Sequence, residues 1–211
     1  MLGDIFNFVL HIDGYLAQII ANYGVETYAI LFAIIFVETG LVFVPFLPGD
    51  SLLFAAGALA ALGSLSVEAL LPLLMVAAIL GDTVNYWIGY LFGKKLVAST
   101  WIPINDDHIE QTRQFFHSHG KKTIILARFV PIVRTFAPFV AGISRMNYGQ
   151  FIKYNVAGGI IWVLSATLAG FFFGNIPVVR ENFSLVVLGI VGISLLPMLV
   201  PLVKELIGRT R

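Results

Sequence analysis

Three long apolar stretches set the strongest limit on what this chain can fold into. They cover roughly residues 70–92, 151–174 and 184–203. A helix of about 20 apolar residues crosses the ~30 Å hydrocarbon core of a bilayer. Charged residues make up only 12% of the chain, against about 25% in ordinary soluble domains. The sequence therefore predicts an all-α integral membrane protein in which residues 1–211 form a single membrane domain.

Two further apolar stretches are interrupted by proline and glycine. Residues 26–62 contain Pro45, Pro48 and Gly49, and residues 122–143 are predicted to be broken by Pro131 and Pro138. A helix break frees backbone N–H and C=O groups that lipid cannot satisfy, so it is tolerated only inside protein or beside a wet cavity. We therefore expect each stretch to form a re-entrant helical hairpin.

Two less apolar regions are also expected to be helical. The first twenty residues mix acidic side chains and a histidine with many apolar ones, and they contain no Lys or Arg. This pattern predicts a helix that lies in the membrane interface and is not a cleaved signal peptide. In the polar region 94–120, a helix is predicted near 106–118 with Asn105 or Asp106 as its N-cap.

The broken stretches and the spans that follow them share motifs in the same order. Val44-Pro45 and Ala56-Gly57 correspond to Val130-Pro131 and Ala141-Gly142, and the pattern from Gly89 to Gly93 corresponds to that from Gly170 to Gly174. Such self-similarity indicates an internal repeat. We assign repeat 1 to about residues 1–93, repeat 2 to about 106–174, and a C-terminal transmembrane helix to about 184–203.

The distribution of Lys and Arg predicts how these repeats are oriented. None precedes residue 94, whereas the central loop and the C-terminal tail are rich in both, and the loop at 175–183 has only Arg180. The positive-inside rule then places the central loop and the C-terminus in the cytoplasm. One hairpin must enter from outside and the other from inside, so the repeats are inverted. Inverted repeats with broken helices are typical of secondary transporters.

Four charged residues lie well inside the two hairpins, away from their ends. Glu38 and Asp50 belong to the first, and Arg128 and Arg134 to the second. A charge at the bilayer centre costs about 2.5–3.5 kcal/mol even on a lenient scale. One interpretation is two structural salt bridges. The other is a polar cavity in which the carboxylates exchange protons and the arginines hold an anion through bidentate hydrogen bonds.

Other polar and aromatic residues are open to more than one interpretation. Asp82 and Asn85 share a face of the span 70–92 and could form either a relay to the cavity or a helix–helix hydrogen bond. The histidines and aspartates of the central loop are expected to be a solvated helix face and not a metal site. The residues expected to be packing or interface anchors are Trp87, Trp162, Tyr86, Tyr90 and Tyr148.

The usual enzyme motifs were sought and not found. The chain has no His-Glu-x-x-His, Gly-x-Ser-x-Gly or Walker motif. It also has no cysteine, so disulfides and thiolate metal sites are excluded. We therefore expect a transporter and not an enzyme, without a cofactor, a metal or a nucleic-acid partner.

At the charged positions the sequence resembles the DedA family, a bacterial branch of the superfamily that includes the eukaryotic VTT-domain scramblases. The likeness extends over nearly the whole chain and is closest to the family's namesake members. The residues that carry it are Glu38-Thr39-Gly40, Phe46-Leu47-Pro48-Gly49-Asp50-Ser51, Gly81-Asp82, His11-Ile12-Asp13, and Ile124 through Gly142 with Arg128-Phe129-Val130-Pro131-Ile132-Val133-Arg134-Thr135.

This resemblance implies a multi-pass protein of the bacterial inner membrane with two re-entrant hairpins and a dependence on the proton-motive force. It also implies that Glu38 and Asp50 are the essential acids and that Arg128 and Arg134 are the essential arginines. Family members are implicated in moving phospholipids or undecaprenyl phosphate between leaflets.

Three classes of function follow from this sequence. The leading hypothesis is a proton-dependent lipid flippase or scramblase in which Arg128 and Arg134 bind the lipid phosphate, while Glu38, Asp50 and Asp82 couple protons or bind substrate. The second is a proton-coupled exporter of a small solute or cation. The third is a scaffold whose buried charges are structural. The sequence leaves a homo-oligomer open.

Overall fold

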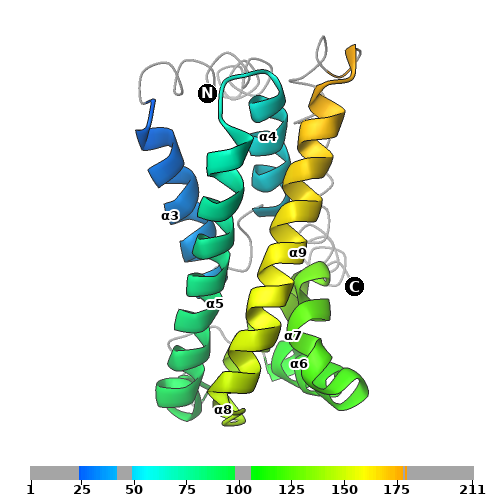
Figure 1. Ribbon diagram of the computed structural model, residues 1–211. Coiled ribbons are helices and arrows are strands. Elements are labelled where there is room, and N and C mark those ends of the chain that lie inside the picture. The colour runs from blue at the N-terminus through cyan, green and yellow to red at the C-terminus, as the bar shows by residue number, and fades with distance from the viewer. Residues whose placement is uncertain (1–23, 42–48, 98–105, 178, 180–211) are drawn as a thin grey trace, which may run out of the picture. The chain divides into compact units, whose positions relative to one another are not determined.

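The computed structural model describes residues 24–41, 49–97, 106–177 and 179, and within these ranges every regular element is helical (Figure 1). Three predicted features lie outside the described residues: the N-terminal interfacial helix, the part of the proline-glycine interruption that covers 44–48, and the C-terminal span at 184–203. The helices are α3 (Glu26–Gly40), α4 (Gly49–Ala61), α5 (Val67–Val97), α6 (Asp106–His119), η1 (Gly120–Lys122), α7 (Thr123–Leu126), η2 (Ala127–Phe129), α8 (Pro131–Ile143) and α9 (Tyr148–Gly174).

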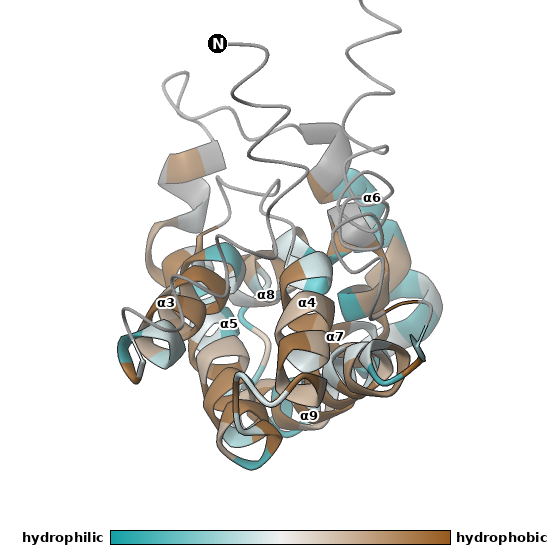
Figure 2. Ribbon diagram, turned by 90° about the horizontal axis from the view of Figure 1, so that it is seen from above, coloured by the Kyte–Doolittle hydropathy of each residue, from teal (hydrophilic) through white to brown (hydrophobic). Residues whose placement is uncertain are grey.

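Helices α5 and α9 confirm two of the predicted spans. Val67–Gly93 and Tyr148–Gly174 are each 27 residues long and apolar enough to cross a membrane. The apolar character of these helices is evident in Figure 2, where α6 is visibly more polar. The predicted helix near 106–118 is confirmed by α6.

The side chains of α5 are distributed as expected for a helix in contact with lipid. Leu80 and Leu91 are 45% and 61% exposed, whereas Asp82 and Asn85 are 4% and 0% exposed. A water-soluble helix would place these groups the other way round. Polar groups that face the interior of a membrane helix bundle are, in contrast, the usual arrangement in lipid.

The two proline-interrupted stretches each form separate helices. The stretch 26–62 contains α3 and α4, and the stretch 122–143 contains α7, η2 and α8. Val130 is extended, with φ −118° and ψ 107°, and Pro131 is the first residue of α8, a position where the missing N–H costs nothing. The predicted second break at Pro138 is wrong, because Pro138 lies inside a continuous α8.

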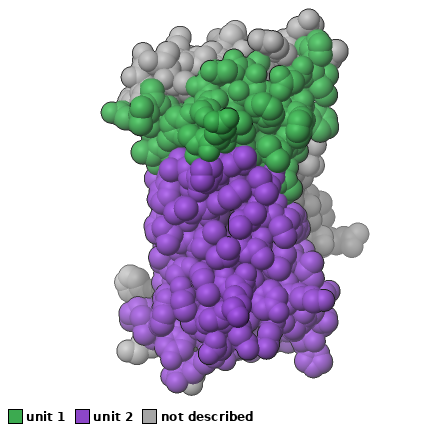
Figure 3. Space-filling view, viewed as in Figure 1, with its two compact units in different colours: residues 1–30, 48–70, 165–211 green, residues 31–47, 71–164 purple. Residues whose placement is uncertain are grey.

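The described residues divide into two compact units, coloured separately in Figure 3. Among the described residues, unit 1 contains 24–30, 49–70, 165–177 and 179, and unit 2 contains 31–41, 71–97 and 106–164. Each unit combines a short helix from one predicted repeat with part of the long helix from the other. Unit 1 contains α4 and the end of α9, and unit 2 contains α8 and most of α5.

In unit 1, α4 packs closely on the end of α9 through glycines. A Cβ at Gly57 would overlap the carbonyl of Thr167, and a Cβ at Gly170 would overlap the carbonyl of Phe54. The rings of Phe54 and Phe173 are 6.0 Å apart. Glycine thus permits helix contacts that are too close for any side chain.

Unit 2 makes the corresponding contacts with the corresponding motifs. A Cβ at Gly142 would overlap the carbonyl of Tyr86, and a Cβ at Gly89 would overlap the carbonyl of Phe139. The predicted repeat pairs Gly57 with Gly142 and Gly170 with Gly89. The two glycines of each pair therefore have the same packing role in the two units. The internal repeat, its inverted orientation and the re-entrant hairpins stay predictions.

The core of unit 2 holds α8 between α5, α6 and the start of α9. Phe136, Phe139 and Val140 of α8 cluster with Ile109 of α6, and all four are at most 4% exposed. Residues from α5, α7, η2, α8 and α9 form an adjoining cluster: Tyr86, Ile124, Ala127, Val133, Ala137, Ala141 and Phe151.

Candidate functional site

Arg134 and Glu38 form a buried ion pair in unit 2. Arg134 lies in the first turn of α8, and its Nη2 donates a hydrogen bond to Oε1 of Glu38, near the end of α3. The two side chains are 11% and 3% exposed. A charge-assisted hydrogen bond of this kind is among the stronger polar contacts in proteins, and here it joins the first and second predicted hairpins.

Arg128 and Asp82 form the second buried pair. Nη2 of Arg128 donates to Oδ2 of Asp82 at 2.5 Å and to Oδ1 of Asn155 at 2.6 Å. Asn155 is held in place because its Nδ2 donates to the carbonyl of Ile79 at 3.0 Å. The Arg128 and Asp82 side chains are only 2% and 6% exposed, so this pair links η2, α5 and α9 away from solvent.

The indole of Trp162 lies beside both arginines. The guanidinium carbons of Arg128 and Arg134 are 5.6 Å and 5.1 Å from the centroid of its ring, within the ~6 Å range of a cation–π contact. Trp162 is 1% exposed. A single buried aromatic ring therefore contacts the cationic members of both ion pairs.

Glycine makes room for Arg128 on α9. A Cβ at Gly158 would lie 3.2 Å from Cδ and 3.2 Å from Nε of Arg128, and 3.2 Å from the Cα of Ile125. A side chain at this position would press on the arginine and on the α7 backbone. The small residue thus lets the charged side chain lie flat against α9.

Asn85 connects three helices beside the two pairs. Its Nδ2 donates to the carbonyls of Thr39 in α3 at 3.2 Å and of Thr135 in α8 at 2.9 Å. Of the two roles open to Asn85, the described contacts show the helix–helix hydrogen bond. These bonds hold the residues next to Glu38 and Arg134, since Thr39 and Thr135 are their immediate sequence neighbours.

We call Glu38, Asp82, Arg128 and Arg134 the charged cluster. With all four ionised it contains two positive and two negative charges, so its formal sum is zero. Nε and Nη1 of Arg128 are buried and have no hydrogen-bond partner among the described residues. Because leaving a charged donor unsatisfied is costly, these N–H groups could serve an additional anionic acceptor.

The structure brings together four of the five predicted site residues. Asp82, which the sequence placed on a separate span, is directly paired with Arg128. The fifth residue, Asp50, belongs to unit 1, where it is an exposed residue in the first turn of α4. A carboxylate in a first helical turn interacts favourably with the helix dipole.

Sequence reasoning missed Asn155 and gave Trp162 only a packing or anchoring role. Both lie on α9, seven residues apart, which places them on the same face of a helix. A polar amide in an otherwise apolar span was the available signal for Asn155, because such residues usually face the interior of a bundle.

Comparison with known proteins agrees with the prediction of a membrane protein. The model of the VTT domain matches residues 47–172. Protein DedA of Escherichia coli strain K12 is 54% identical over 202 residues, covering 94% of this chain and 92% of that protein. An uncharacterized membrane protein of Mycobacterium leprae is 46% identical, covering 79% of this chain and 75% of its own length. Inner membrane protein YqjA of the same Escherichia coli strain is 39% identical, with 72% of this chain and 69% of that protein covered.

No solved structure matches the chain. The family match covers more than half of the chain, and the similarity to relatives named as membrane proteins extends across most of it. With its apolar spans and buried charges, this chain is therefore a membrane protein of the VTT-domain family to which the DedA proteins belong.

Proposed function

We propose that this protein moves a membrane lipid with a phosphate headgroup between the leaflets of the bacterial inner membrane, and that the proton-motive force drives the movement. Undecaprenyl phosphate and the phospholipids both have the required headgroup. The observation that carries the proposal is the charged cluster, in which two arginines and two carboxylates lie buried within apolar helices.

The arginines supply the chemistry for a phosphate group. A guanidinium has five N–H donors in a planar fork that fits phosphate oxygens. Arg128 uses Nη2 for Asp82 and Asn155 and has Nε and Nη1 left over. In the proposal these spare donors and the Arg134 guanidinium hold the headgroup, and Trp162 keeps the two guanidinium groups in place.

The charge balance of the cluster explains why protons would be needed. A phosphodiester brings one negative charge into a cluster whose formal sum is zero, and an uncompensated buried charge is strongly unfavourable. Protonation of one carboxylate restores the sum to zero. Glu38 is suited to this role because its proton would also release Arg134 from the ion pair.

Asp82 is the other carboxylate of the cluster that could take up this proton. Asp82 is held against Arg128 at 2.5 Å. Asp50 lies outside the cluster, and we propose a role in proton coupling for it from its place in the sequence and in the first turn of α4. On this account headgroup and proton enter the cluster together, so the two movements are coupled.

The acyl or isoprenyl chains need not enter the polar interior. Exposed apolar side chains extend along α5, and further ones lie on α9 at Ile160 and Ile161, which are 37% and 48% exposed. Such surfaces match hydrocarbon, so the chains can stay in the bilayer while only the headgroup meets the cluster. The predicted hairpins, entering from opposite faces, would provide access from both leaflets.

Headgroup movement of a labelled phospholipid in proteoliposomes tests the proposal. We expect the Arg134→Ala variant to lose movement. The control is Arg145→Gln, because Arg145 is an exposed arginine in the turn between α8 and α9. If Arg134→Ala moves lipid as fast as the wild type, the phosphate site is assigned wrongly. If the wild type moves no lipid but releases protons with a small solute or cation, the protein is an exporter.

A further inference from the structure

Helix α6 and the adjoining segments form two cavities outside the charged cluster. The first, of about 450 Å³, lies between α6, η1 and the end of α8, a volume within the ~300–1,000 Å³ range of ligand sites. The second, of about 490 Å³, adjoins η1, α7 and α9. Lys121 lines both, so the two share a cationic side chain.

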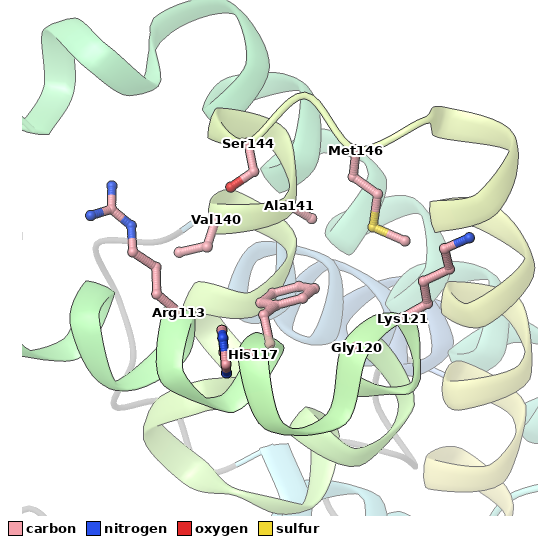
Figure 4. A pocket seen from close by; sticks show the side chains of 9 residues that line it. Arg113, His117, Gly120, Lys121, Val140, Ala141, Ser144 and Met146 are labelled. Carbon is pink, nitrogen blue, oxygen red and sulfur yellow. The ribbon is translucent and has the colours of Figure 1, made fainter.

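The first cavity combines a cationic rim with an apolar floor. Arg113, His117 and Lys121 line it together with the hydroxyl of Ser144. In the view of Figure 4, Arg113 and Lys121 lie on opposite sides, with Val140 and Ala141 between them. Its apolar lining comes from Phe116, Val140, Ala141 and Met146.

The cations of this rim are available to a ligand. Arg113 has a carboxylate at 3.9 Å, that of Glu110, but both side chains are more than half exposed, and exposed pairs of this kind hold together weakly. Lys122 extends the positive surface into the second cavity, which His119 also lines. This arrangement attracts anions, since several positive side chains face one opening.

The apolar part of the lining favours a lipid over a soluble anion as the ligand. A free phosphate gains nothing from Phe116 and Met146, whereas a lipid can lay the first part of its chain on them. Leu126, which lines the second cavity, is 40% exposed, and an exposed side chain of this kind is suited to the hydrocarbon boundary. Basic and apolar groups on one interfacial helix are typical of binding to anionic lipids.

We propose that the α6 cavity is a second lipid site, which binds the phosphate headgroup of an anionic lipid between Arg113, His117 and Lys121 and places the upper part of its chain against Phe116 and Met146. This site is separate from the charged cluster and requires only that the protein lies in a membrane. Where the proposed transport operates, the α6 site would hold lipid at the membrane surface before or after it reaches the cluster.

Titration of the full-length protein with dioctanoyl phosphatidic acid, followed by native mass spectrometry, tests this site. Removing one lysine near a phosphate costs about a fivefold loss in affinity. We expect that loss in Lys121→Gln and again in Arg113→Gln. The matched control is Lys153→Gln, which removes an exposed lysine of α9 that lines neither cavity. Equal affinity in Lys121→Gln and wild type would overturn the proposal, and so would an equal loss in Lys153→Gln.

Two further arms identify the ligand and separate this site from the cluster. Inorganic phosphate should bind far more weakly than the lipid, and Met146→Gln should weaken only the lipid. If inorganic phosphate binds as tightly as the lipid, the site takes a soluble anion and the lipid assignment is wrong. Arg134→Ala should keep the lipid binding that depends on Lys121. If this variant loses that binding, the α6 site is not separate from the charged cluster. A protein that binds lipid at α6 but moves none would instead contradict only the proposed transport.

Discussion

The ion pair between Asp82 and Arg128 gives the sharpest prediction about stability. Asp82→Asn keeps the size of the side chain but leaves the Arg128 charge buried, since Arg128 is 2% exposed and its remaining described hydrogen bond is to Asn155. Removing one partner of a buried pair costs about 3–5 kcal/mol. For a chain of this length, about 1 kcal/mol corresponds to about 2–4 °C. We therefore expect the unfolding midpoint to fall by about 6–20 °C.

A second substitution separates the effect of the unpaired charge from that of the lost contact. Replacing Arg128 by Gln in the Asp82→Asn background removes the buried charge, so the double variant should recover most of the lost stability. The measurement is thermal unfolding of the purified full chain in one detergent, followed by tryptophan fluorescence. A double variant that is as unstable as Asp82→Asn alone would contradict this explanation.

An exposed ion pair provides the matched control. Glu110 and Arg113 are 3.9 Å apart, and their side chains are 58% and 57% exposed. Exposed pairs contribute about 0–1 kcal/mol, so Glu110→Gln should shift the midpoint by less than about 4 °C. If Asp82→Asn shifts the midpoint no more than Glu110→Gln does, the substitution does not leave a buried unpaired charge on Arg128, and our assignment of the ion pair is wrong.

Three further substitutions test the surroundings of the cluster and the packing of α8 on α5. Asn85→Ala should destabilise the protein by about 1–3 kcal/mol, because two buried carbonyls lose their donor; Asn175→Ala removes an exposed Asn–carbonyl bond and should cost less in the same unfolding assay. Trp162→Leu should slow lipid movement more than Trp162→Phe does, because phenylalanine keeps an aromatic face, which contributes about 0.5–2 kcal/mol in a contact with a cation. Equal rates of lipid movement in the two variants would count against the cation–π role of Trp162. Gly142→Ala should cost about 1–3 kcal/mol through overpacking against α5, whereas Gly149→Ala, where only a side-chain oxygen lies nearby, should be nearly neutral in the same melts.

Hydropathy alone predicted the long helices, because crossing a bilayer depends on the composition of a whole stretch. The structure extends the predicted 70–92 to Val67–Val97 and moves the start of 151–174 to Tyr148. Local capping accounts for the starts of both helices. Ser66 Oγ accepts from the N–H of Ala69 at 3.4 Å, and Asn147 Oδ1 accepts from the N–H of Gln150 at 3.2 Å.

The rule that proline interrupts a helix gave a correct prediction at Pro131 and a wrong one at Pro138. At Pro131 the helix begins, as the missing N–H predicts. At Pro138 the helix continues, and the next residues, Phe139 and Val140, are 0% and 2% exposed. Packing on both sides of α8 outweighs the loss of one hydrogen bond there, and that packing cannot be read from a local rule.

The sequence identified the charged residues but not how they pair. Their presence follows from composition, since charges within apolar segments are conspicuous. Which carboxylate meets which arginine depends on how far each helix is shifted and rotated against its neighbours. Contacts such as that of Gly158 with Arg128 fix this register at the level of single atoms, so the Asp82–Arg128 pair and the place of Asn155 emerged only from the structure.

The central claim is that headgroup and proton enter the charged cluster together. The most direct test measures movement of a labelled phospholipid in wild-type proteoliposomes with an imposed pH gradient, and again after an uncoupler has collapsed that gradient. We predict that the gradient drives label toward one leaflet, that the uncoupler abolishes this bias, and that Glu38→Gln is insensitive to the gradient. Movement by the wild-type protein that is equally fast and equally distributed with and without the gradient would contradict the account.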